Sequence, residues 1–138
     1  MDADDVRQAA AASRALLEHA ERRDWSVAAH GVDMTVAEVV AHVGATLLGF
    51  AADLAAGGAT LDALHTRFDP GAPPGALVAG VVAGSEVLGA VVAASPPEAR
   101  GHHAFGSADA SGFAAMGVLE LLVHTDDAAR GLGIGFEP

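Results

Sequence analysis

The chain is 138 residues long, 51% of them hydrophobic, and it has a formal net charge of −11. This charge argues against binding to nucleic acid or to an anionic membrane, because both need a cationic surface. The absence of Cys excludes disulfides, cysteine metal sites and a cysteine nucleophile. The many Ala and Leu residues favour helix, and we predict a single all-α domain over residues 1–138.

The first predicted helix runs from about Asp4 to Arg23. Its apolar residues recur at helical spacing, and Ser13 is the one small polar residue on the same stripe. Acidic residues open the segment and arginines close it, as the helix dipole favours. Because the N-terminal stretch MDADDVRQAA is acidic where a secretory signal is basic, we expect a cytoplasmic protein.

The second predicted helix has the cleanest apolar stripe in the sequence. It starts at Thr35, where T-V-A-E has the Ser/Thr-x-x-Glu form of a capping box, and it ends at Gly57-Gly58. The stripe consists of Val36, Val39, Val40, Val43, Leu47, Phe50 and Leu54. A loop that contains FDPGAPPG follows and separates this helix from the third.

The third predicted helix spans about residues 75–95 and is closed by a Pro-Pro pair, since proline cannot continue a helix interior. Residues 76–94 are almost numerous enough to span a membrane, but Glu86 lies near their centre, where an acid costs about 2–3 kcal/mol. We therefore predict a buried bundle helix. Gly80 and Gly84, four residues apart, would let a neighbouring backbone approach closely.

The fourth predicted helix follows the loop GHHAFGSAD and spans about Ser111 to Arg130. Gly131 is its predicted C-cap, and Arg130 can pair with Asp126 one turn earlier. The sequence has no internal repeat and no strand-like alternation. Four helices of about 20 residues each indicate an all-α fold, an antiparallel four-helix bundle.

The fourth helix carries a polar pair inside an apolar run. From Phe113 to Val123 every residue is apolar or Gly except Glu120, and His124 follows four residues later on the same face. A buried carboxylate without a partner is strongly unfavourable, so Glu120 needs either a partner or a proton. His124 could be that partner, which would make the pair an ion pair within one helix.

His42 is the other His embedded in an apolar helix, at the flank of the second helix's stripe, where it could face a groove between helices. Two His and one Glu from facing helices suit zinc, iron or another divalent first-row metal. Three protein ligands leave a position open for water or substrate. The spacing alone leaves both interpretations open, a metal site and a core or surface ion pair.

The remaining polar residues are weaker candidates. Asp127, three residues after the last candidate ligand, could hold that ligand's second ring nitrogen or could belong to a solvated turn. Glu86 fits a solvated helix face, the His102-His103 pair fits an exposed loop, and Trp25 fits a plug at the end of a bundle. No other candidate ligands surround His19, His30 and His65.

Three stretches together resemble the DinB-type metal-binding bundles: TVAEVVAHVG in the second helix, HHAFGSADASGF, and MGVLELLVHTDDAARGLG in the fourth. The resemblance is closest to the N-terminal domain of mycothiol-dependent maleylpyruvate isomerases and covers residues 25–133. It implies an antiparallel bundle with a groove at one end, where a metal, usually zinc, is held by residues that match His42, Glu120 and His124. It also implies an Asp after the last ligand, which matches Asp127.

The same resemblance implies that a low-molecular-weight thiol, mycothiol in actinobacteria, binds near the metal and attacks an electrophilic substrate. We therefore expect a thiol-dependent transferase or isomerase-like metalloenzyme. A non-catalytic metal- or ligand-binding module, or the N-terminal fragment of a two-domain isomerase, are the alternatives. Two departures from the family pattern concern the pocket and the substrate. Met34 stands where relatives often have Trp, which changes one pocket wall. No obvious basic residue lies near the site to fix an acidic substrate such as maleylpyruvate, and Arg100 and Arg130 are the nearest candidates.

Overall fold

The computed structural model describes all 138 residues, and its four helices match the predicted segments to within a few residues. A short hairpin precedes the last helix. The elements are α1 (Ala3–His19), α2 (Val36–Ala56), α3 (Pro74–Ala94), β1 (Gly101–His103), β2 (Gly106–Ala108) and α4 (Ala110–Gly131). The prediction of an all-α fold is confirmed.

The capping box predicted for α2 is present. Thr35 is the N-cap, and its hydroxyl accepts the backbone N–H of Glu38 at 3.3 Å, while the Glu38 carboxylate accepts the Thr35 N–H at 2.7 Å. Gly57 ends the helix with a φ of 67°, a backbone conformation that glycine adopts without strain. The cap fixes where α2 starts and therefore the direction in which His42, about two turns further on, projects.

Two helix ends differ from the prediction. α1 stops at His19, with turns leading on through the arginines. α4 continues through Gly131 and has its C-cap at Leu132, so Gly131 is not the cap. A Cβ built on Gly131 would lie 2.5 Å from the carbonyl oxygen of Ala28. Glycine is needed there because another segment of backbone passes close by.

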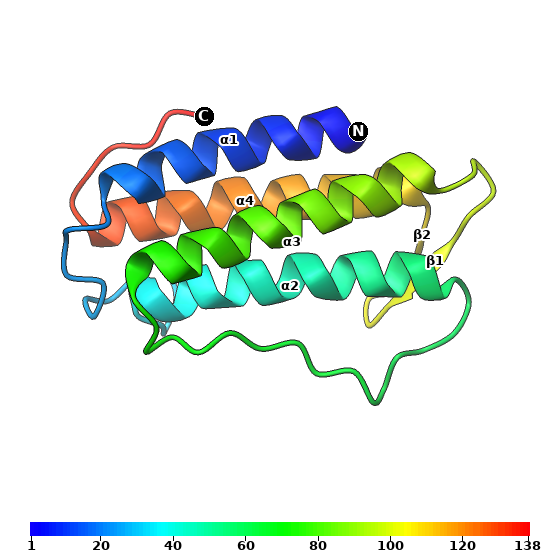
Figure 1. The fold of residues 1–138 in the computed structure, drawn as a ribbon, viewed down its shortest axis with the longest axis horizontal. Coiled ribbons are helices and arrows are strands. Elements are labelled where there is room, and N and C mark those ends of the chain that lie inside the picture. The colour runs from blue at the N-terminus through cyan, green and yellow to red at the C-terminus, as the bar shows by residue number, and fades with distance from the viewer.

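The helices lie side by side in a bundle, with α1 and α2 at opposite corners (Figure 1). The loop from Gly57 to Pro73 returns along the outside of α2, so α3 begins at the same end of the bundle as α2. As a result α2 and α3 run parallel, as do α1 and α4. The antiparallel packing that was predicted holds for the pairs α1–α3 and α2–α4, and the bundle therefore contains both kinds of helix pair.

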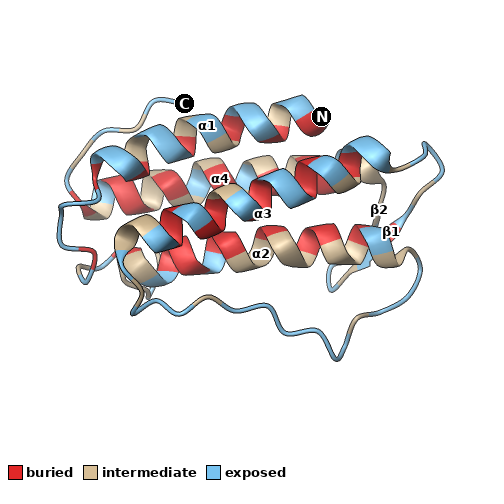
Figure 2. Ribbon diagram, viewed as in Figure 1, coloured by how far each residue is buried: buried red, intermediate tan, exposed pale blue.

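α2 and α3 make the most extensive helix contact, through glycines. A Cβ built on Gly84 would lie 2.9 Å from the carbonyl oxygen of Gly44, so the prediction of a close backbone approach is confirmed. The ring of Phe68, from the returning loop, lies against Gly44 and Gly80. This contact anchors the loop to both helices. Buried residues line the inner faces of all four helices (Figure 2).

A β-hairpin joins α3 to α4 where the sequence predicted only a loop. β1 pairs antiparallel with β2, and His102 lies opposite Ser107. Strands of three residues are too short for an alternating pattern to be recognised. His102 is exposed, as expected, but His103 is partly buried and its ring packs on Phe50, with centroids 5.3 Å apart.

By length and composition, α2 and α3 are both apolar enough to cross a membrane. Inside the bundle, however, 50% of an apolar 18-residue stretch of α2 and 44% of one in α3 are buried against the rest of the chain. The core helices of a helical bundle are buried in this way. Length and composition alone therefore give only weak support for a membrane-spanning helix. Glu86 lies on the exposed face of α3, as predicted.

Candidate metal centre

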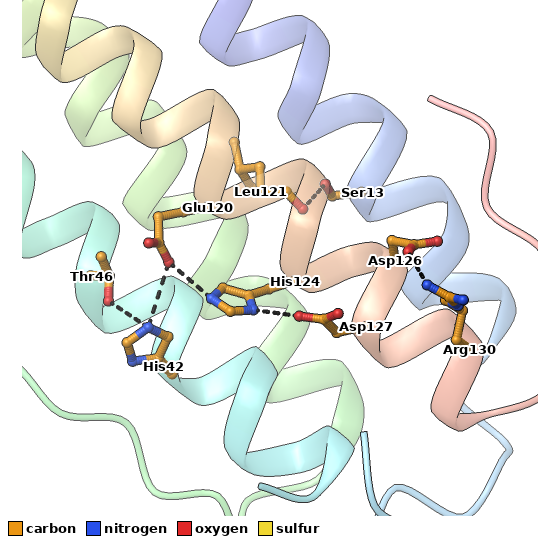
Figure 3. Close-up of polar contacts among 9 residues, drawn as sticks. All are labelled: Ser13, His42, Thr46, Glu120, Leu121, His124, Asp126, Asp127 and Arg130. Carbon is orange, nitrogen blue, oxygen red and sulfur yellow. Dashed lines mark hydrogen bonds and ion pairs between the residues drawn. The ribbon is translucent and has the colours of Figure 1, made fainter. Parts of the chain in front are cut away.

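Three side chains converge between α2 and α4 (Figure 3). His42 projects from α2, and Glu120 and His124 project from neighbouring turns of α4. The Oε2 atom of Glu120 lies 3.5 Å from Nε2 of His42 and 3.4 Å from Nε2 of His124. No two of the three candidate ligand atoms are more than 4.8 Å apart. We refer to these residues as the triad.

The Oε2 atom of Glu120 is buried and accepts no hydrogen bond. Its separations from the two imidazole nitrogens are those of an ion pair, but they are longer than the hydrogen bonds that such groups form when they meet directly. A tetrahedral zinc ion with bonds of 2.0–2.1 Å holds its ligand atoms about 3.3 Å apart. The spacing around this buried oxygen therefore fits an ion between the ligands better than a direct contact.

Asp127 fixes the orientation of the His124 ring. Its Oδ2 atom lies 2.9 Å from Nδ1 of His124. Because an ionised carboxylate can only accept hydrogen bonds, the Nδ1–H group of His124 is the donor. Nε2, which faces Glu120, is then left with a free lone pair, the form in which an imidazole binds a metal. The backbone N–H of His30 donates to the Asp127 carbonyl at 2.9 Å, which ties the α1–α2 connection to this turn of α4.

The triad has one dry side and one open side. The side chain of Glu120 is 23% exposed and that of His124 is 17% exposed, whereas that of His42 is 45% exposed. Thr46, one turn after His42, places its hydroxyl 3.4 Å from Nε2 of His42. Solvent and small molecules can therefore reach the site past His42.

Two hollows meet at His42, and the returning α2–α3 loop forms one wall of each. The first, called here the Arg67 hollow, has a volume of about 500 Å³ and is lined by Met34, Glu38, Ala41, His42, Ala45, Thr66, Arg67, Phe68 and Pro70. The second, called here the Asp53 hollow, has a volume of about 220 Å³ and is lined by His42, Ala45, Thr46, Gly49, Phe50, Asp53, Thr66 and His103. Thr66 lies between them, where its hydroxyl donates to the Ala45 carbonyl at 3.0 Å.

Of the other sequence candidates, His103 lines the Asp53 hollow, and none of the rest lines either hollow at the triad. Trp25 is buried and its indole N–H donates to the Ala20 carbonyl at 3.0 Å, in keeping with a plug at the end of the bundle. Asp126 pairs with Arg130 at 3.5 Å, as predicted. The exposed histidines outside the triad contribute to no cluster of candidate metal ligands; they are His19, His30, His65 and His102.

The structure corrects the choice of nearby cations. Arg100 donates to the carbonyls of Pro97 and Ala99, and Arg130 is bonded to Asp126. Neither arginine lines the Arg67 hollow or the Asp53 hollow, whereas Arg67 lines the first of them. Sequence reasoning missed Arg67 because its loop has no periodic pattern that would place it. Thr46 carried a signal, since it follows His42 by four residues and so lies on the same helix face.

A family model described as the mycothiol maleylpyruvate isomerase N-terminal domain matches residues 6–129. The chain belongs to this family. No curated protein and no solved structure matches the chain.

Membership in the mycothiol maleylpyruvate isomerase N-terminal domain family confirms the resemblance inferred from the helix motifs, and the matched range includes all three triad residues. It also agrees with the helical bundle. The family description relates the chain to mycothiol chemistry. The assignment of His42, Glu120 and His124 as ligands, with Asp127 behind them, stays a prediction.

Proposed function

We propose that this domain binds one divalent ion, with zinc the best match, through His42, Glu120 and His124, and acts as a thiol-dependent transferase or isomerase-like enzyme. The buried, unbonded Oε2 of Glu120, with an imidazole nitrogen 3.4–3.5 Å away on each side, is the observation that carries the proposal. One carboxylate and two imidazoles form a donor set that suits zinc. The family description supports mycothiol as the thiol.

A divalent ion at this place would lower the pKa of a thiol and supply a thiolate at neutral pH. The side chains of the triad prepare the place for it. Glu120 contributes the one negative charge, and Asp127 holds His124 with Nε2 free. His42, on the open side, leaves room for the thiol and for an electrophile to approach from the hollows.

The reaction would then add the thiol across an electrophilic double bond: the sulfur bonds to one atom, the π bond opens, and the other atom takes up the thiol's proton. In an isomerase-like reaction, the carbon–sulfur bond would break again after rotation about the opened bond, which re-forms the double bond and releases the thiol. Because low-molecular-weight thiols stay reduced in the cytoplasm, we expect the reaction to take place there. We also propose that residues 1–138 fold as one domain, since all four helices share one core.

Thiol binding can be tested by spectroscopy on protein loaded with cobalt, which replaces zinc and absorbs light. On addition of mycothiol, the wild type should gain a thiolate-to-cobalt charge-transfer band, and Glu120→Gln should not. A thiol-transfer assay with mycothiol and a generic electrophile then measures turnover of the zinc-loaded protein.

Two outcomes separate the enzyme from a binding module. A charge-transfer band together with turnover supports the enzyme. A metal-loaded protein that shows neither the band nor turnover contradicts it, and favours the alternative of a non-catalytic metal-binding module of the same fold. Ser13→Ala, at a buried hydroxyl that bonds the Leu121 carbonyl away from the triad, is a control for general damage to α4.

A further inference from the structure

The two hollows beside His42 differ in charge, and this difference separates the ligands that each can take. The wall of the Arg67 hollow contains one guanidinium, that of Arg67, and one carboxylate, that of Glu38, whereas the Asp53 hollow has a carboxylate and no Lys or Arg. Both hollows contain His42, so a molecule bound in either one lies next to the triad. The volume of the Arg67 hollow, about 500 Å³, falls within the range of small-molecule sites.

Arg67 forms no ion pair with a carboxylate of the protein, although acids outnumber bases by 18 to 7. Arg22, Arg23 and Arg100 form none either, but of these four arginines Arg67 is the one that lines a hollow at His42. A planar guanidinium with free N–H donors matches the geometry of a carboxylate and binds it with two parallel hydrogen bonds.

The loop is anchored on both sides of Arg67. The Thr66 hydroxyl donates to the Ala45 carbonyl of α2, and the Phe68 ring lies in the notch formed by Gly44 and Gly80. These two contacts hold the backbone of Arg67 in place against α2. An arginine held in this way loses less freedom on binding than one in a mobile loop, which favours affinity.

We propose that the Arg67 hollow is the anion subsite of this domain, in which Arg67 binds a carboxylate of the electrophilic substrate and so directs the substrate's reactive carbon toward the triad. This proposal rests on the proposed function. It assigns to the α2–α3 loop a positioning residue outside the triad. The Asp53 hollow, whose carboxylate repels anions, is left for the uncharged part of the thiol.

Glu38 shares the Arg67 hollow and opposes the anion. Hydrogen bonds from the backbone N–H and the hydroxyl of Thr35 hold the pKa of Glu38 below its usual value, so its carboxylate stays ionised at neutral pH. Its negative charge lowers the affinity of the hollow for anions, and the two charged residues are expected to act with opposite signs.

The test is a calorimetric or NMR titration with succinate, a stable dicarboxylate, and with succinamide, its uncharged counterpart, on zinc-free and zinc-loaded protein. Arg67→Ala should weaken succinate binding about five- to tenfold. Arg67→Lys keeps the positive charge but cannot form two parallel hydrogen bonds, so its succinate affinity should lie between those of the wild type and Arg67→Ala. Glu38→Gln should strengthen binding about twofold. Arg22→Ala, at another exposed arginine without an ion pair, is the matched control and should change nothing.

Equal succinate affinity in the wild type and Arg67→Ala would overturn the proposal, as would wild type that binds no succinate or binds succinamide equally well. The zinc content of Arg67→Ala should equal that of the wild type. If the wild type itself takes up no zinc, the proposed function fails, but the difference between Arg67→Ala and wild type remains measurable in the zinc-free protein. The two failures are therefore distinguishable.

Discussion

His42 differs from the other two proposed ligands because it belongs to a different helix. Glu120 and His124 are held at a fixed spacing by α4 alone, and an ion pair between them would need no tertiary structure. The packing of α2 on α4 brings His42 to the same carboxylate oxygen, at 3.5 Å. That third contact turns a local pair into a site that could hold a metal ion.

Replacement of Asp127 by Asn should weaken zinc binding about ten- to a hundredfold, because the carboxylate that accepts the Nδ1–H of His124 would be lost. The affinity is measured by competition with a chelating dye. Asp126→Asn is the matched control, since Asp126 pairs with Arg130 on the other side of the same turn. Equal losses in both variants would mean that the effect comes from damage to α4 and not from the orientation of His124.

Helical spacing allowed Glu120, His124 and Asp127 to be placed on one face of the fourth helix, since the positions i, i+3 and i+4 lie close together. It left open whether Glu120 and His124 form an ion pair or part of a metal site. The pairing of His42 with α4 needed the family resemblance, because periodicity within a helix does not say which helix lies opposite. Arg67 could not be predicted to lie near the triad, because its position depends on the path of a loop.

The N-terminus of α2 is stabilised by the capping box of Thr35 and Glu38, in which the Glu38 carboxylate is charged. Since the pKa of Glu38 is lowered in the folded state by its bonds to Thr35, the cap stabilises the protein above the unfolded pKa of about 4.5, and this stabilisation is lost as the pH falls through the lower folded pKa. In urea unfolding, the stability difference between wild type and Glu38→Gln should therefore shrink between about pH 6 and pH 3. A difference that is constant with pH would contradict the charged cap.

The α2–α3 contact depends on a glycine that has no room for a side chain. Gly84→Val should destabilise the fold by about 2 kcal/mol or more, because its Cβ would meet the Gly44 carbonyl oxygen and Leu47. Ala83→Val, which adds the same side chain on the exposed face of α3, should cost only a few tenths of a kcal/mol, on the order of the helix-propensity difference. Thermal unfolding followed by circular dichroism compares the two, and similar losses would rule out the steric explanation.

The helices themselves could be predicted well, because long apolar stripes and the Thr35 capping box are local signals. The hairpin of β1 and β2 could not, since its strands are three residues long. The parallel direction of α2 and α3 also escaped prediction. It follows from a loop that is long enough to return along α2, and its anchors, Thr66 and Phe68, act through contacts far away in the sequence.

For the whole molecule, zinc binding should be visible as stability, because the ligands come from two helices and the unfolded chain does not hold them together. At a free zinc concentration about 100 times the Kd, the free energy of unfolding should rise by about 2.7 kcal/mol. Magnesium, which prefers oxygen ligands and keeps its waters, should have little effect. The unfolding midpoint is measured with and without each ion, and an equal rise with magnesium would contradict a site built on two imidazoles.

α2 and α4 together form one metal site in the function proposed for this domain. A calorimetric zinc titration of the wild type, His42→Ala and Glu120→Gln, with metal content measured after dialysis, tests this joint site. We predict one zinc ion per chain in the wild type and loss of stoichiometric binding in both variants, with the helical content unchanged. A wild type that retains no zinc after zinc has been supplied, or a His42→Ala variant that binds zinc as the wild type does, would contradict the joint site.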